Sequence, residues 1–199
     1  MIESMMTAFS VTLLVVVFLA ASVNKLRSLE IFEGVVYNFR VLPETLVRPV
    51  AYILPYLELA VVVALIAPAT RSYSGWAAGI LLGVFTVAVA INLLRGRREI
   101  DCGCFGSGHM SSDLKQTLSW WLVLRNIVLA GLALWVAAAP AATTLGTGTG
   151  WLLGILGIVT AITVAILYVT AMWLSIAARY HAARGATPAF EHHRFSTQN

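Results

Sequence analysis

The sequence contains only two cysteines, and a single glycine separates them in Cys102-Gly103-Cys104. Randomly placed cysteines would rarely fall this close, so the spacing is informative. Two such thiols can close a small disulfide ring, which is strained because the sulfurs require a narrow torsion range. Strained, exposed disulfides have higher reduction potentials and are typically the labile or catalytic ones. The spacing therefore predicts a cysteine pair that cycles between dithiol and disulfide.

The residues around the pair suit this chemistry. Arg97 and Arg98 lie just upstream, and nearby positive charge favours the reactive thiolate. The glycines at positions 103, 106 and 108 leave the backbone open to an attacking partner. The alternative is a pair of inert, reduced thiols, because free cysteine often behaves as a small hydrophobic residue.

A metal site is a second interpretation of the same segment. Cys102, Cys104 and His109, with Met110 beside them, are soft ligands of the kind that copper(I) or zinc prefers. A closed zinc site requires four ligands at recognisable spacings, and this pattern offers three. The sequence thus gives weaker support to metal binding than to redox cycling, and His109 alone is typical of a solvated loop.

The composition determines the environment of the chain. Of its 199 residues, 59% are hydrophobic and 11% are charged, and the mean hydropathy is +0.85. Soluble domains carry about 25% charged residues, and disordered chains are poor in hydrophobic residues. The pI is basic, at 9.4, but the sequence lacks the stripe of Lys and Arg residues with which proteins contact a nucleic acid backbone. These values predict an all-α, polytopic helical bundle in lipid, in the plasma or inner membrane of the cell.

The elements follow from the apolar blocks, because about 20 apolar residues span a bilayer. Four spans are expected within a membrane domain covering residues 1–140, at about 5–23, 50–67, 75–94 and 120–139. A Gly/Thr linker at 143–150 precedes a fifth span at about 151–177 and a polar tail at 178–199. Gly75, Gly79 and Gly83 are four residues apart, which predicts a face for close helix packing.

The mixed segment 28–48 is too short and too charged to span a membrane. Within it Ile31, Val35 and Phe39 recur every four residues, with Phe32 and Val36 beside them, which predicts an apolar stripe on a short helix. We expect this helix to lie on the membrane surface and to end at Pro43. In the next span, Pro49 suits the first turn of the helix.

Lysine and arginine counts predict the orientation. Eleven of these residues fall on one side of the predicted spans and only Arg71 on the other, leaving aside Arg125 within a span. Glu3 is the only charged side chain before the first apolar block, which favours an uncleaved anchor over a signal peptide. We therefore expect the N-terminus outside, the C-terminus in the cytoplasm, and a cytoplasmic loop at 95–119.

Glu58 and Arg125 are the ionisable residues within predicted spans, where charges are costly and usually functional or paired. We expect them to form an ion pair beneath the cysteine loop, either in catalysis or only to fix helix register. Asn92, Lys25 and the cysteine loop map to the same side of the membrane, so the polar residues converge on one half of the bundle. Trp120 and Trp121 begin a span and fit an interfacial aromatic belt, or alternatively cover a quinone ring.

Several short motifs occur in a particular order along residues 8–138. They are Asn24-Lys25, Leu42-Pro43, Leu54-Pro55-Tyr56-Leu57-Glu58-Leu59, Arg95-Gly96-Arg97, Cys102-Gly103-Cys104-Phe105-Gly106, Ser119-Trp120-Trp121 and Leu124-Arg125-Asn126. This ordered set resembles the MauE family of methylamine utilisation membrane proteins, which are related to DoxX-like four-helix proteins. The stretch from Arg95 to Gly106 is its most specific part.

The resemblance implies a DoxX-like four-helix core and a membrane redox protein that supports disulfide formation or cofactor maturation in a partner. It implies as client the small subunit of methylamine dehydrogenase, which acts outside the cytoplasm, and as relay a thioredoxin-like protein. The positions that match the family are Glu58, Cys102, Cys104 and Arg125.

The leading hypothesis is therefore a membrane thiol–disulfide oxidoreductase that exchanges electrons with a thioredoxin-like partner, with a quinone as a possible acceptor. Because the chain has one cysteine pair, any route to a quinone must use that pair directly. The rival hypotheses are a non-enzymatic assembly or scaffold subunit and a soft-metal carrier.

Overall fold

The computed structural model describes residues 2–97, 118–139 and 155–167, together with the single positions 152, 169, 170 and 174. These residues are helical apart from short connections. The labelled helices are α1 (Ile2–Arg27), α2 (Leu29–Phe39), α3 (Glu44–Ile66), α4 (Arg71–Leu94) and α5 (Trp120–Ala138), with a 3-10 turn at Pro68–Thr70. Of these, α1, α3, α4 and α5 are long and apolar enough to cross a membrane. The structure thus supports the predicted multi-pass helical bundle.

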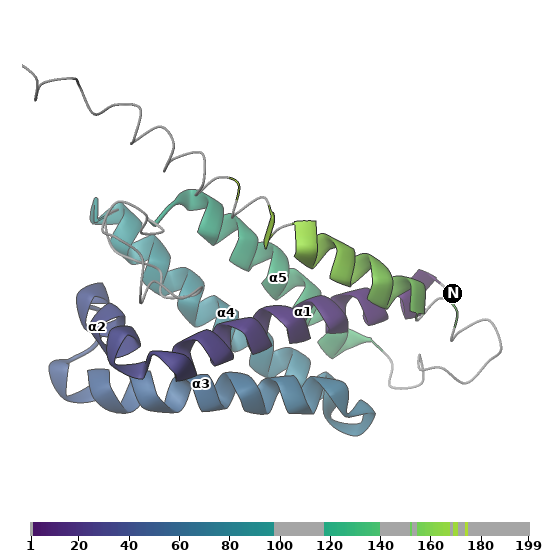
Figure 1. Ribbon diagram of the computed structural model, residues 1–199, viewed down its shortest axis with the longest axis horizontal. Helices are drawn as coiled ribbons and strands as arrows, with labels where there is room; N and C mark the ends of the chain where they lie inside the picture. The colour runs from purple at the N-terminus through teal and green to yellow at the C-terminus, as the bar shows by residue number, and fades with distance from the viewer. Residues whose placement is uncertain are drawn as a thin grey trace, which may run out of the picture.

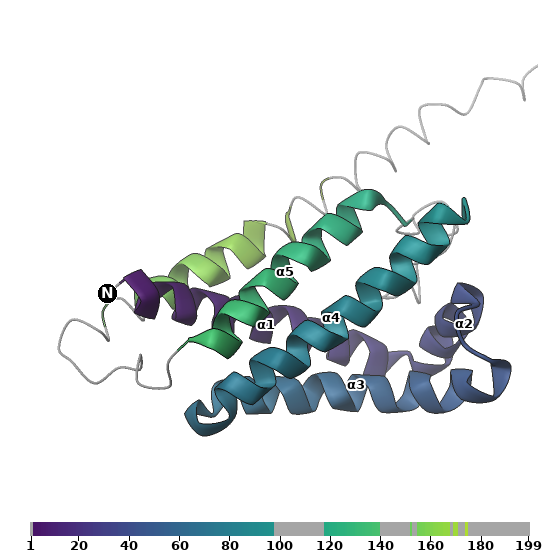
Figure 2. The same ribbon diagram turned by 180° about the vertical axis from the view of Figure 1, so that it is seen from behind.

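The long helices alternate in direction, so that their ends gather at two ends of the bundle (Figure 1). At one, which we call the α2 end, α1 and α4 finish, α3 and α5 begin, and α2 lies between α1 and α3. The N-terminus of the chain and the turn between α3 and α4 lie at the other, as the reverse view in Figure 2 confirms. Residues 98–117, with both cysteines, connect α4 to α5 and are therefore joined to the bundle at the α2 end.

Apolar side chains from all four long helices form the main core. Its buried members come from α1, α3, α4 and α5, for example Leu14, Leu65, Leu82 and Val136. The outer faces are also apolar, with side chains such as Val63 exposed over 63% of their surface. Helices that are apolar on every side suit a lipid environment, where the outer faces need no polar cover.

Helix α3 begins earlier than the sequence predicted, at Glu44 and not near residue 50. Pro43 occupies the N-cap position, and Glu44 places a negative charge in the first turn, where the helix dipole favours it. The prediction of Pro49 in the first turn was therefore wrong. Both Pro49 and Pro55 lie inside a helix that continues through them.

Helix α2 ends at Phe39, before Pro43, because Arg40 adopts a left-handed conformation with φ of 47°. A left-handed residue at this position is a common helix stop. The buried face consists of Phe32 and Val35, whereas Ile31 is 41% exposed. The predicted stripe is therefore confirmed at Phe32 and Val35, with Val36 and Phe39 packed beside them, and it is wrong at Ile31; this face of α2 packs against α3.

Two arginines fasten α2 to the end of α4. The Arg95 side chain donates a hydrogen bond to the carbonyl of Arg40, and the Arg97 side chain donates one to the carbonyl of Asn38, each at 3.2 Å. The last carbonyls of a helix have no partner within the helix and are stabilised by such donors. These arginines, expected only as orienting or thiolate-stabilising charges, thus also hold α2 in place.

Close packing of α4 on α5 depends on one glycine of the predicted stripe. A Cβ atom at Gly75 would lie 2.6 Å from the backbone nitrogen of Ala137 and 2.8 Å from the carbonyl oxygen of Ala133. Gly79 makes only ordinary contacts with Leu134, and a Cβ at Gly83 would meet nothing within 4 Å. The predicted packing face is therefore correct at Gly75 and wrong at Gly83.

The described part of the predicted fifth span is an apolar helix at Ile155–Leu167. It packs on the start of α1, where a Cβ at Gly157 would lie 2.7 Å from the carbonyl oxygen of Met5. The linker at 143–150 and the tail at 178–199 lie outside the described residues.

Replacing Gly75 by alanine should destabilise the bundle by about 1–3 kcal/mol, because the methyl group overlaps the backbone of α5. Gly83→Ala is the matched control, and it should be neutral or slightly stabilising, because its methyl group enters open space in the same helix. Thermal unfolding of the detergent-solubilised protein, followed by size-exclusion chromatography, compares the two. Equal melting temperatures for both variants would contradict the packing of α4 on α5.

Candidate functional site

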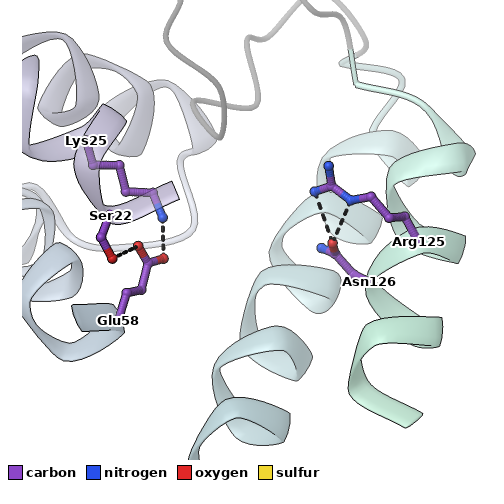
Figure 3. Close-up of polar contacts among 5 residues, drawn as sticks. All are labelled: Ser22, Lys25, Glu58, Arg125 and Asn126. Carbon is purple, nitrogen blue, oxygen red and sulfur yellow. Dashed lines mark hydrogen bonds and ion pairs between the residues drawn. The ribbon is translucent and has the colours of Figure 1, made fainter. Parts of the chain in front are cut away.

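A buried ion pair joins α1 to α3 near the α2 end. Lys25, close to the end of α1, donates from its Nζ to the Oε1 of Glu58 in α3. The two side chains are only 3% and 1% exposed. Ser22, one turn before Lys25, donates its hydroxyl to the other carboxylate oxygen at 3.5 Å (Figure 3). The spacing of three residues puts Ser22 and Lys25 on one face of α1, so that both reach Glu58.

Two aromatic rings complete the surroundings of the ammonium group. The Nζ of Lys25 lies 5.2 Å from the ring centre of Phe32 in α2 and 4.8 Å from that of Phe85 in α4. Burying a charge costs several kcal/mol unless it is paired, and each ring face adds an attraction of about 1–2 kcal/mol when water is excluded. One ammonium group therefore contacts side chains from α2, α3 and α4 in addition to its own helix.

The ion pair that the structure records for Glu58 is with Lys25, whereas the sequence predicted Arg125 as its partner. The half-buried Arg125 donates from Nε and Nη2 to the Oδ1 of Asn126, at 3.4 and 3.2 Å (Figure 3). The physical reason lies in helix adjacency: α1 packs directly on α3, whereas α3 and α5 share no close backbone contact. Because α1 continues to Arg27, it carries Lys25 into the bundle beside Glu58.

Glu58 and Arg125 nevertheless face a common space. A small cavity of about 60 Å³ is lined by Lys25, Glu58, Arg125 and Asn126, with apolar walls that include Phe39 and Phe85. We call it the polar cavity. Its size and lining suit water molecules, which require several polar partners. The predicted convergence of charged residues is therefore correct in location, although the pairing differs.

Asn92 is fully buried in α4 and donates from Nδ2 to the carbonyl of Ala88 at 3.0 Å. Its Oδ1 has no hydrogen-bond partner among the described residues. A buried, unsatisfied acceptor costs about 1–3 kcal/mol. Asn92 thus lies near the α2 end, as expected, but it does not line the polar cavity.

Trp120 and Trp121 are the first two residues of α5, and they are 52% and 62% exposed. Neither lines the polar cavity. This exposure at the end of a span fits the predicted aromatic belt. A role in covering a quinone stays a prediction.

The candidate redox and metal-binding residues lie outside the described residues; they are Cys102, Cys104 and His109. The redox pair and the alternative metal site are therefore both untested by the geometry. In the part of the chain that the structure does describe, no three His, Cys, Asp or Glu side chains gather to hold a metal ion.

The sequence places Lys25 on the same side of the membrane as Glu58 and Arg125, but as a loop charge that follows a span ending at residue 23. Its contact with Glu58 was not predicted. The available signal was its spacing from Ser22 on a helix that continues to Arg27. With Lys25 removed from the loop charges, ten residues still oppose Arg71 alone, so the predicted orientation is unaffected.

The described helices define a polytopic helical membrane protein with a charged pair buried in its core. The family model for methylamine utilisation protein MauE matches residues 3–139, which is more than half of the chain. This protein belongs to the MauE family, as its motifs predicted.

Curated relatives agree with this assignment. The methylamine utilization protein MauE of Paracoccus denitrificans is 51% identical over 146 residues, which are 71% of this chain and 75% of the relative. The MauE proteins of Methylorubrum extorquens and Methylophilus methylotrophus are 45% and 41% identical, over 70% and 66% of this chain and 75% and 67% of their own lengths. No solved structure matches this chain, so the DoxX-like relationship of the core stays a prediction.

Removing either member of the ion pair should destabilise the protein by about 3–5 kcal/mol, because the remaining charge stays buried without its partner. Lys25→Met and Glu58→Gln test the two sides. The double variant Lys25→Met/Glu58→Leu should recover most of this loss, since neither charge of the pair is left buried without its partner. Arg27→Met is the matched control, because it removes an exposed charge two residues away. Thermal unfolding in detergent measures all four, and single variants as stable as Arg27→Met would contradict the buried pair.

Proposed function

We propose that this chain is a membrane thiol–disulfide redox protein in which Cys102 and Cys104 are the reacting groups. In each cycle the cysteine pair, as a disulfide, oxidises a thioredoxin-like partner. The partner loses two electrons and two protons and gains a disulfide, and Cys102 and Cys104 become a dithiol. Returning them to the disulfide requires an acceptor of two electrons and two protons. A second partner disulfide or a membrane quinone meets this requirement.

The observation that carries the proposal is the buried polar group of Lys25, Glu58 and Arg125 at the α2 end, where the cysteine segment joins the bundle. Cys102 is five positions after Arg97 in the sequence, and an extended chain covers at most about 3.6 Å per position. Chain length therefore keeps Cys102 within about 18 Å of Arg97. Thiols release protons on oxidation, and a carboxylate beside a cavity of water size would supply a proton acceptor at the end of the bundle to which the cysteine segment is joined.

The family assignment supports the choice of client. The relatives are named as methylamine utilization proteins, and we propose that this chain likewise serves methylamine metabolism by supporting an enzyme of the methylamine dehydrogenase type. The proposed location is the inner membrane, with several spans in contact with lipid. A scaffold subunit and a soft-metal carrier are the alternatives that the following experiment separates.

Replacing both cysteines by serine should abolish client maturation and leave the bundle intact, because neither residue belongs to the described core. In cells, alkylation trapping of the wild type should reveal both dithiol and disulfide forms of Cys102 and Cys104. Client activity and melting temperature are measured in parallel. A scaffold would still mature its client without the cysteines. Thiols that remain reduced under all conditions would contradict the redox role, and copper or zinc lost in the same variant would identify a carrier.

The variant Lys25→Met/Glu58→Leu asks whether the buried pair has a chemical role as well as a structural one. If Glu58 accepts a proton during thiol oxidation, reoxidation of Cys102 and Cys104 should slow by at least about tenfold in this variant, although it folds. Stopped-flow oxidation followed by alkylation measures the rate. An unchanged rate in a stable protein would leave the pair with a structural role only.

The charge distribution predicts that the cysteine segment faces the cytoplasm, whereas a methylamine dehydrogenase client lies outside it. The native cysteines report their own location, because the chain has no others. A membrane-impermeant maleimide should label them only after the inner membrane is opened. The control is a variant without native cysteines that carries Ala69→Cys, an exposed site in the turn at the opposite end, which should be labelled in intact cells. Rapid labelling of the native pair in intact cells would reverse the orientation.

A further inference from the structure

An apolar groove of about 480 Å³ runs between α2, α3 and α4. All of its described lining residues are apolar, and they include Phe39 from α2, Leu54 from α3 and Phe85 from α4. Ile80 also lines it and is 64% exposed, so the groove opens on the lipid-facing surface of the bundle. A groove with this lining suits a hydrocarbon chain, which brings no polar group that would have to be paired.

Positive charge lies at the end of this groove where α2 stops. The guanidinium group of Arg95 donates to the carbonyl of Arg40 at 3.2 Å. That of Arg97 donates to the carbonyl of Asn38, also at 3.2 Å. The two carbonyls belong to the residues on either side of Phe39, which lines the groove. Two guanidinium groups and the backbone of a third arginine therefore lie beside a groove residue.

The charges at the α2 end do not cancel. Outside the polar cavity, the described residues of this end carry five arginines and three glutamates: Arg27, Arg40, Arg48, Arg95, Arg97, Glu30, Glu33 and Glu44. Among the described residues, none of the three arginines around Phe39 forms a salt bridge. A guanidinium has five N–H donors, and the bonds of Arg95 and Arg97 to α2 use one each. These groups therefore suit a phosphate, which arginine binds through paired N–H groups.

The depth of the groove matches that of an acyl chain. Its α4 wall runs from Ala88 to Ile80, which are seven and fifteen positions before Arg95. At a rise of about 1.5 Å per residue, this wall lies about 10–22 Å from Arg95 along the helix. One leaflet contributes about 15 Å of hydrocarbon, which is half of the bilayer core. A lipid with its head group at Arg95 therefore has its acyl chains at the level of the groove.

We propose that this end of the bundle binds one anionic phospholipid, with its phosphate at Arg40, Arg95 and Arg97 and an acyl chain in the groove. Basic sites beside membrane helices typically select anionic lipids. A zwitterionic lipid is bound less well, because its choline cation is repelled by the same arginines. The site is independent of the cysteine chemistry, since the groove and the three arginines are complete without that segment.

Two kinds of variant test the two halves of this site. Arg40→Gln removes a cation and keeps the recorded contact, because Arg95 donates to the backbone carbonyl of Arg40. Arg27→Gln is its matched control, since it removes an exposed cation at the other end of α2. Gly83→Phe fills the groove, because Gly83 lines it and a Cβ atom there would meet nothing within 4 Å. Gly131→Phe is the control in α5, where the glycine is also open but does not line the groove.

The experiment titrates the full chain in detergent with phosphatidylglycerol or with phosphatidylcholine of the same acyl chains. Native mass spectrometry measures binding of the first lipid. The wild type should bind phosphatidylglycerol at least about tenfold more tightly than phosphatidylcholine. Arg40→Gln should weaken binding of phosphatidylglycerol by about fivefold and change that of phosphatidylcholine by less than about twofold. Arg27→Gln should change neither.

The groove variants report on the acyl chain in the same titrations. Gly83→Phe should weaken binding of both lipids by at least about fivefold, because the chain loses its apolar contacts, and Gly131→Phe should change neither. Gly83→Leu replaces Gly83→Phe if the phenylalanine lowers the melting temperature. Inorganic phosphate should not displace the lipid, since it has no chain for the groove to bind.

Three results would overturn the proposal. Equal affinities of the wild type for the two lipids would remove the selective head-group site. Unchanged selectivity in both Arg40→Gln and Arg95→Gln/Arg97→Gln would place the phosphate elsewhere. Unchanged binding by both Gly83 variants would exclude the groove, and displacement of the lipid by inorganic phosphate would identify a site for free phosphate in place of a lipid site.

Discussion

The buried attraction between Lys25 and Glu58 is the interaction on which the rest of the α2 end depends. Both charges are almost fully enclosed, so each is tolerable only while the other is in place. This requirement fixes the position of α1 against α3 along their length. Because the ammonium also faces Phe32 and Phe85, the same constraint aligns α2 and α4. Apolar packing alone specifies such alignment weakly in lipid, where an outward-facing leucine costs little.

The polar and apolar features of this end are two sides of one aromatic wall. Phe39 and Phe85 line both the polar cavity and the apolar groove of about 480 Å³ between α2, α3 and α4. Among the described lining residues, the cavity has four polar side chains and the groove has none.

Much of the bundle could be predicted from the sequence, because apolar runs of membrane length have few alternatives. The spans that begin at Gly75 and Trp120 end in the structure within one residue of the expected position. The partner of Glu58 could not be predicted, since which helices are neighbours is not encoded in the composition of any one span. Because the sequence assigns Lys25 to a loop, its contact with Glu58 was not predicted. The apolar face of α2 was predicted correctly except at Ile31, because the contact with α3 decides which edge of the stripe is buried.

The contacts of Arg95 and Arg97 have a mechanical consequence. Both side chains donate hydrogen bonds to carbonyls at the end of α2. The first cysteine, Cys102, follows Arg97 five positions later in the sequence. Helix α2 is also one wall of the groove. Any displacement of α2, whether by a bound molecule or by the thickness of the surrounding bilayer, is therefore transmitted through two hydrogen bonds to the anchor point of the cysteine segment. We therefore expect the end of α2 and Arg97 to move together.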